Sequence, residues 1–103
     1  MENPKRFQSL KEFYPFYLTE HSNSTSKLLH FIGTSLFFII LFYGIYSGQL
    51  HLLWFMPLVG YGFAWVGHFF FEKNKPATFQ YPFYSLASDF MMYFDILSGK
   101  VKI

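Results

Sequence analysis

The feature that most constrains the fold is a run of 44 consecutive residues, Leu28 to Phe71, that contains no Asp, Glu, Lys or Arg. All eight basic and all six acidic residues of the chain lie outside this run. A soluble domain of 103 residues would need charge on the surface of such a segment, whereas a bilayer accepts little charge in its hydrocarbon core. The run therefore predicts a membrane protein.

The composition agrees with this prediction and excludes several kinds of site. Aromatic residues make up 25% of the chain, which is more apolar surface than a small soluble domain can bury but which lipid can cover. A net charge of +2 gives no support to a nucleic-acid partner. The absence of cysteine excludes disulfides, thiolate metal sites and a cysteine nucleophile. The length predicts one membrane domain, residues 1–103.

A turn-forming cluster, Ser47-Gly48-Gln49, divides the uncharged run into two segments, 28–47 and 50–71. At about 1.5 Å per residue, each segment as a helix would reach roughly 30 Å, the thickness of a hydrocarbon core. The two segments are therefore predicted to form a helical hairpin of two spans. Pro57 is expected to kink the second helix. Its small residues are expected to let another helix approach closely, and these are Gly60, Gly62, Ala64 and Gly67.

The segments outside the hairpin predict two further helices. Near the N-terminus, Ser9 and Glu12 have capping-box spacing, and Pro15 is expected to bend or interrupt the helix. The apolar face of this interfacial helix is predicted to comprise Phe7, Leu10, Tyr14, Tyr17 and Leu18. Residues 23–26 are predicted to form a loop or cap before the first span.

The last apolar segment, Phe83 to Leu97, is short for a span and carries Asp89 and Asp95. It is predicted to be a helix that lies in the membrane interface or packs against the hairpin. The predicted fold is thus an all-α membrane protein, a two-span helical hairpin with an N-terminal interfacial helix and a C-terminal interfacial or packed helix.

Basic residues predict the orientation of the hairpin. Four precede it and four follow it, and the turn between the spans has none. The positive-inside rule then predicts that both termini are cytoplasmic. The membrane would be the inner membrane in a bacterium or the endoplasmic reticulum in a eukaryote.

Histidines are the only groups in the run that ionise near neutral pH. In an antiparallel hairpin, His30 and His68 both lie at the cytoplasmic end, whereas His51 lies roughly 30 Å away at the other end. Glu72 follows His68 by four positions and so shares its helix face. His21 lies in a polar stretch that can fold back onto the first span.

Three imidazoles and a carboxylate are therefore predicted to converge at one membrane surface. Such nitrogen and oxygen ligands suit iron, zinc or manganese. Asp89 is a further candidate, either as a ligand or as the acceptor that determines which nitrogen of a histidine carries the proton.

Three blocks of sequence form a recognisable pattern: Glu20-His21 with Asn23, Leu29-His30-Phe31 with Gly33, and Gly67 to Lys73 followed by Pro76-Ala77. From about Phe13 to Ala77 this pattern resembles the 2-hydroxy-fatty-acid dioxygenase family, long catalogued as a membrane domain of unknown function. Characterised members are iron(II)-dependent enzymes of fatty-acid alpha-oxidation, acting for instance in phytosphingosine breakdown. The chain resembles a compact, bacterial-type branch, because longer members have more membrane segments between the histidine blocks.

The resemblance implies that His21, His30 and His68 are catalytic ligands of Fe(II), with Glu72 as a weaker catalytic candidate. A 2-hydroxy acid can chelate iron through its carboxylate and hydroxyl and leave a site for dioxygen. Oxidative cleavage between C1 and C2 then shortens the acid by one carbon. The surface from Tyr61 to Phe71 is a candidate groove for the acyl tail, and nearby lysines could attract the carboxylate, namely Lys27, Lys73 and Lys75.

Other hypotheses remain open at this stage. His30 and His68 could be axial ligands of a haem held between the two helices. The chain could instead be a non-catalytic membrane scaffold whose polar residues only set its topology. Taken singly, each histidine and each carboxylate could be an interfacial residue bonded to water or backbone.

Overall fold

The computed structural model describes residues 7–75 and 79–103, and all regular structure in these residues is helical. Lys5, Arg6 and the Pro76-Ala77 pair lie outside the described residues. Within the described residues, the named elements in chain order are the α-helices α1 (Leu10–Thr19) and α2 (Ser24–Tyr46), the 3-10 helix η1 (Leu50–Trp54), the α-helix α3 (Phe55–Val66), the π-helix η2 (Gly67–Glu72) and the α-helix α4 (Pro82–Leu97). The predicted all-helical fold is confirmed.

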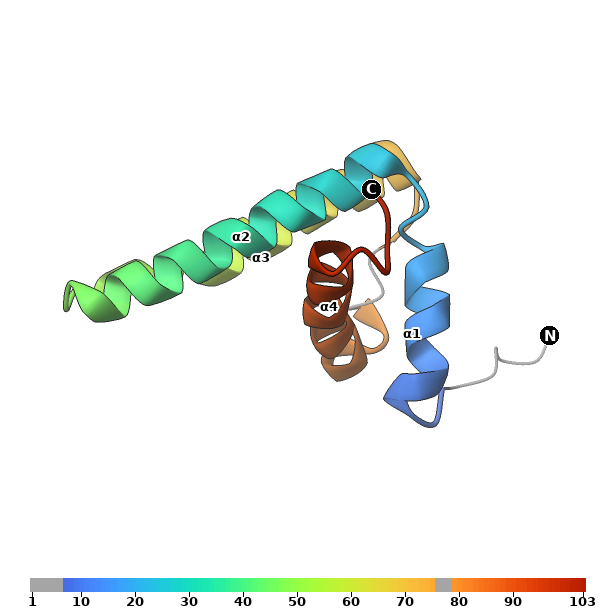
Figure 1. The fold of residues 1–103 in the computed structure, drawn as a ribbon, viewed down its shortest axis with the longest axis horizontal. Helices are drawn as coiled ribbons and strands as arrows, with labels where there is room; N and C mark the ends of the chain where they lie inside the picture. Colours follow the sequence, from blue (N-terminus) through green and yellow to red (C-terminus); the bar gives the residue numbers. More distant parts are fainter. Residues whose placement is uncertain (1–6, 76–78) are drawn as a thin grey trace.

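The long arm in Figure 1 is the predicted hairpin, with α2 lying along α3. Its turn falls at Ser47–Gln49 as predicted, and Gly48 has a φ of +73°, a conformation that suits glycine. The first helix starts at Ser24, four residues earlier than predicted, because the Asn23 side chain caps it by accepting a hydrogen bond from the Ser26 amide. The second helical segment runs from Leu50 to Glu72 and changes from 3-10 to α geometry at Phe55, two residues before Pro57.

Both arms of the hairpin are long and apolar enough to cross a membrane. Each has 23 residues, with mean hydropathies of 2.1 and 1.3 in their most apolar windows. Only 22% and 6% of those windows are buried, whereas the core helix of a soluble protein would be mostly buried. Large apolar side chains point outward, including Trp54 at 82% exposure and Phe70 at 67%. Exposed apolar surface of this extent calls for an apolar covering, and lipid is the simplest one.

Two glycines let the arms of the hairpin touch. A methyl group added at Gly33 of α2 would lie 2.7 Å from the Phe63 Cβ, and one added at Gly67 would lie 3.0 Å from the Ser26 Oγ. The expectation for the small residues of the second arm is thus right for Gly67, whereas Gly62 faces open space and Gly60 has only an ordinary contact. Close contact at Gly67 brings η2 against the start of α2.

Helices α1 and α4 lie side by side across one end of the hairpin (Figure 1). Their shared core consists of Phe13, Tyr17 and Met92, of which Phe13 was absent from the predicted apolar face. The two acidic residues of α4 are paired with α1, because Tyr17 donates a 2.5 Å hydrogen bond to Asp89 and Tyr14 donates a 2.7 Å bond to Asp95. Helix α4 therefore packs against α1 and α2, and packing was one of the two predicted options for this helix.

The N-terminal helix begins at the predicted cap, where the Ser9 hydroxyl accepts a hydrogen bond from the Glu12 amide. The expected interruption at Pro15 is wrong, since α1 continues through this residue to Thr19. Pro15 lies on the exposed side of the helix, where water can bind the carbonyl that loses its amide partner.

Candidate metal centre

Three buried histidines from three separate segments meet where the hairpin joins α1. His21 follows α1, His30 belongs to α2 and His68 belongs to η2. Ring centroids are 4.5 Å apart for His21 and His68 and 5.9 Å apart for His21 and His30. None of the three side chains is more than 4% exposed. The structure thus brings together the three histidines that the sequence singled out, while their role as ligands stays a prediction.

Local backbone structure positions His68. It lies in a single turn of π-helix, a geometry that appears mostly as short insertions and frequently at functional sites. The turn ends at Lys73, which adopts a left-handed conformation with φ 62°. The main-chain N–H of Asn74 then donates a 3.0 Å hydrogen bond to the His68 carbonyl. With Gly67 against Ser26, this arrangement holds the imidazole of His68 near the α1–α2 connection.

Each imidazole uses one nitrogen to donate a hydrogen bond to an oxygen that can only accept. His21 Nδ1 donates to the Tyr17 carbonyl at 2.9 Å, and His30 Nε2 donates to the Asp89 carbonyl at 2.9 Å. His68 Nδ1 donates to the Asn74 Oδ1 at 2.6 Å. When such a ring is neutral, its remaining nitrogen carries a lone pair, and this is the form in which histidine binds a metal.

Burial keeps His21 in this neutral form. Desolvation is the main cause that lowers its pKa to about 3, and the neighbouring His68 lowers it further. The hydrogen bond to the Tyr17 carbonyl acts in the opposite direction but does not overcome these effects. At neutral pH, His21 therefore presents an unprotonated nitrogen to its surroundings.

The donor set fits a divalent transition metal. A ligating imidazole nitrogen lies about 2.0–2.1 Å from zinc, so two rings that share an ion have centroids no more than roughly 6–7 Å apart. Both measured centroid distances fall within that limit. As the side chains stand in residues 7–75 and 79–103, however, no group of three or more His, Asp or Glu residues has the arrangement of a formed metal site. The three imidazoles lie close together and are of the right chemical type, but as they stand they do not form a group that could hold a metal ion.

Glu72, the weaker candidate, forms hydrogen bonds with the segment that follows His21. Its carboxylate accepts a 2.7 Å hydrogen bond from the Asn23 amide and a 3.4 Å bond from the Ser22 hydroxyl. These two residues directly follow His21, so Glu72 fastens the α1–α2 connection to the end of η2. A direct role of Glu72 in catalysis or metal binding stays a prediction.

Asp89 contacts the site through its backbone as well as its side chain. Its carbonyl accepts the His30 hydrogen bond, and its carboxylate accepts the Tyr17 hydroxyl. Desolvation raises the pKa of Asp89 to about 6, although the Tyr17 hydrogen bond and His68 both oppose this shift. The predicted acceptor that orients a histidine is thus present at Asp89, but it is the main-chain oxygen.

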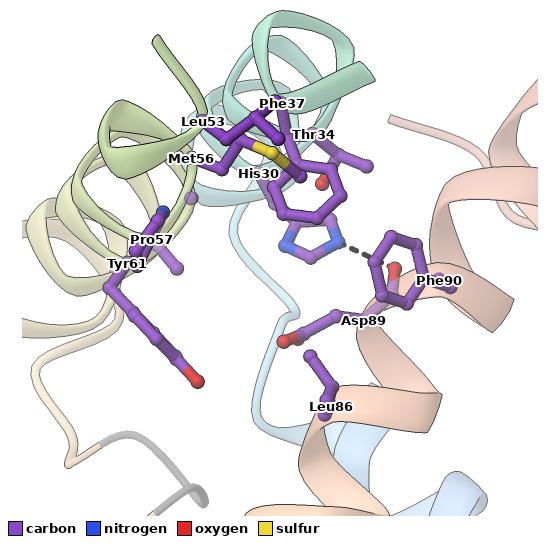
Figure 2. Close-up of a pocket in the computed structure, with 12 residues that line it drawn as sticks. His30, Thr34, Phe37, Leu53, Met56, Pro57, Tyr61, Leu86, Asp89 and Phe90 are labelled. Atoms are coloured by element: carbon purple, nitrogen blue, oxygen red, sulfur yellow. Dashed lines mark hydrogen bonds between the residues drawn. The ribbon is translucent and has the colours of Figure 1, made fainter. Parts of the chain in front are cut away.

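An apolar pocket of about 380 Å³ opens beside His30, between α2, α3 and α4. Figure 2 shows the imidazole of His30 and the side chain of Asp89 at this pocket, with the hydrogen bond from His30 to the main-chain oxygen of Asp89. The polar groups in its wall belong to His30, Thr34, Tyr61 and Asp89, and the rest is apolar. Volumes of about 300–1,000 Å³ with few polar groups are typical of small-molecule sites.

This pocket overlaps the predicted tail groove in part, and the groove stays a prediction. Tyr61 and Ala64 line it, but Phe69 to Phe71 do not. Its other walls come from α2, α4 and the start of the second arm, including Phe37, Met56 and Phe90. Sequence spacing along one helix could not indicate a pocket that three helices build together.

The remaining predicted residues are His51 and three lysines, of which Lys27 lies near enough to His21 to help lower its pKa. His51 is exposed in η1, at the far end of the hairpin from η2. The Lys27 ammonium group donates a 2.7 Å hydrogen bond to the Lys102 carbonyl, and Lys73 and Lys75 are exposed just after η2.

Sequence reasoning missed Asn74 as a partner of His68. A polar residue that follows the helix by a few positions carries no signal of its own, and only the left-handed turn at Lys73 brings it back to the histidine.

Comparison with known proteins gives one match. No curated protein and no solved structure matches the chain. A family model described as 2-hydroxy-palmitic acid dioxygenase Mpo1-like matches residues 7–101, which include all three buried histidines, Glu72, Asn74 and Asp89. Because the match covers nearly the whole chain, the protein belongs to the Mpo1-like family.

Proposed function

We propose that this protein is a membrane-bound, iron(II)-dependent dioxygenase that cleaves a 2-hydroxy fatty acid to a product one carbon shorter. The observation that carries the proposal is the trio of buried imidazoles, each with one nitrogen engaged by an acceptor, beside an apolar pocket. Membership of the Mpo1-like family supports the substrate class.

The chain's own residues would divide the work as follows. The unengaged nitrogens of His21, His30 and His68 would hold the metal, since the other nitrogen of each ring already donates to an oxygen. Iron(II), when bound, supplies the one-electron chemistry that allows dioxygen to react with the substrate. The apolar pocket would hold the acyl chain, with the carboxylate and 2-hydroxyl next to His30.

Burial serves this chemistry in two ways. Excluding water from the three rings strengthens electrostatic interactions at the site, and it keeps His21 neutral. An apolar pocket that opens between helices also lets the acyl chain remain in apolar surroundings. The proposed orientation, with both termini cytoplasmic, would put the histidines at the cytoplasmic surface and the tail toward the bilayer centre.

This topology can be tested with single cysteines, because the chain has none of its own. Ser24, Gln49 and Ser98 are all exposed, and Gln49 lies at the opposite end of the hairpin from the other two. In intact cells, an impermeant thiol reagent should label Gln49→Cys and leave Ser24→Cys and Ser98→Cys unlabelled until the membrane is opened. Labelling of Ser24→Cys from outside would reverse the orientation, and labelling of all three would exclude the two-span model.

Activity is expected from detergent-purified protein supplied with iron(II) and air. A long-chain 2-hydroxy acid should be converted to a product one carbon shorter, detected by mass spectrometry, with consumption of oxygen. The same acid without the 2-hydroxyl should not react, because it loses one arm of the chelate. A chelator or removal of oxygen should stop turnover.

The alternatives make different predictions in the same preparation. A bis-histidine haem protein would be coloured and show a Soret band, whereas the proposed iron site would not. A scaffold would bind no iron and consume no oxygen with a 2-hydroxy acid of any chain length. That last result would refute the proposed function.

A further inference from the structure

Asn74 connects two of the three histidines. Its Oδ1 accepts the 2.6 Å hydrogen bond from His68 Nδ1, and its Nδ2 donates a 3.2 Å bond to the Glu20 carbonyl. Glu20 is the residue directly before His21. One side chain therefore contacts the imidazole of His68 and the backbone that carries His21.

The two contacts determine the orientation of the amide and hence the proton position on His68. A carbonyl oxygen can only accept, so the end of Asn74 that faces Glu20 must be the NH₂ group. The oxygen must then face His68, and Nδ1 of that ring must carry the proton. In the neutral ring, the lone pair is then on Nε2.

The backbone around Asn74 restricts the position of its side chain. The left-handed residue Lys73 reverses the chain, and the Asn74 amide donates to the His68 carbonyl at 3.0 Å. Asn74 is thus held at both its main chain and its side chain, which limits the freedom of its amide group. On the other side of His21, Glu72 binds the amide of Asn23. Glu72 and Asn74 therefore bind the backbone on the two sides of His21, at Asn23 and at Glu20.

We propose that Asn74 is a positioning residue, which holds His68 in the form protonated at Nδ1 and fastens it to the segment that carries His21. The identity of the metal rests on the proposed function, but the proton position on His68 does not. An acceptor that orients a ligating histidine in this way typically contributes about 10–100-fold to metal affinity.

Two substitutions separate the contacts of Asn74. Asn74→Ala removes both the acceptor for His68 and the donor to Glu20. Asn74→Asp keeps an acceptor for His68 and removes only the donor. The exposed neighbour Lys75 provides the control variant Lys75→Ala.

The first measurement needs neither metal nor activity. In metal-free protein with ¹⁵N-labelled histidine, NMR distinguishes a ring protonated at Nδ1 from one protonated at Nε2. Wild type, Asn74→Asp and Lys75→Ala should show His68 protonated at Nδ1, whereas Asn74→Ala should show a mixture or the Nε2 form. An unchanged His68 signal in folded Asn74→Ala would overturn the proposal.

The second measurement is anaerobic titration of each variant with Fe(II). Asn74→Ala should bind about 10–100-fold more weakly than wild type, and Asn74→Asp should retain most of the affinity. If Asn74→Ala does not fold, Asn74→Asp decides the matter, since loss of the Nδ1 proton signal there would refute the positioning role. If wild type binds no Fe(II) while Asn74→Ala shows the expected change in the His68 signal, the proposed function is refuted and the role of Asn74 stands.

Discussion

Replacement of His30 or His68 by alanine is expected to abolish both iron binding and oxygen consumption. Each ring is almost fully buried and offers one unengaged nitrogen, so neither water nor a surface side chain can take its place. If the three rings are the ligands, as proposed, loss of one leaves two, too few to hold the ion in place. The same result is expected for His21→Ala, because this ring lies within 6 Å of both others.

The measurement is iron content by elemental analysis together with oxygen uptake on a 2-hydroxy acid. His51→Ala is the matched control, since this histidine is exposed at the far end of the hairpin and should leave both quantities near wild type. Helical content by circular dichroism separates loss of metal from loss of fold. Iron content that stays unchanged in His68→Ala, with the fold intact, would show that these histidines do not hold the metal.

Filling the apolar pocket is expected to block the substrate while sparing the metal. Gly60 lines the pocket, and a methyl group built on it would lie 3.8 Å from the Phe37 ring, which is ordinary contact. Gly60→Leu would therefore extend a larger side chain into space that the acyl tail would need. We expect kcat/KM for long-chain 2-hydroxy acids to fall by about 10-fold or more, corresponding to at least about 1.4 kcal/mol of lost transition-state stabilisation.

Gly62 provides the control on the other side of the same helix. It does not line this pocket, and a methyl group built on it meets nothing within 4 Å. Gly62→Leu should keep near-wild-type kinetics, and both variants should bind iron as wild type does. Equal kcat/KM values for Gly60→Leu and wild type would mean that the tail binds elsewhere.

The sequence by itself determined the class of fold and the position of the hairpin. An uncharged run interrupted once by Ser47–Gln49 leaves few alternatives to two antiparallel helices, because backbone polar groups in an apolar environment must be satisfied within the helix. The same periodic geometry indicated that His30 and His68 share one end and that His51 lies at the other. These properties depend on helix length and order, which are local features of the chain.

Other features of the site were decided by the tertiary structure alone. The packing of α1 against α4 buries Phe13 and pairs Tyr17 with Asp89, contacts between residues more than 70 positions apart. The 380 Å³ pocket needs walls from three helices at once. Asn74 reaches His68 only because the chain reverses at Lys73. Such contacts depend on packing between segments, which hydrophobic periodicity and residue spacing do not encode, so the three histidines and Asp89 were visible in the sequence but Asn74 and the pocket were not.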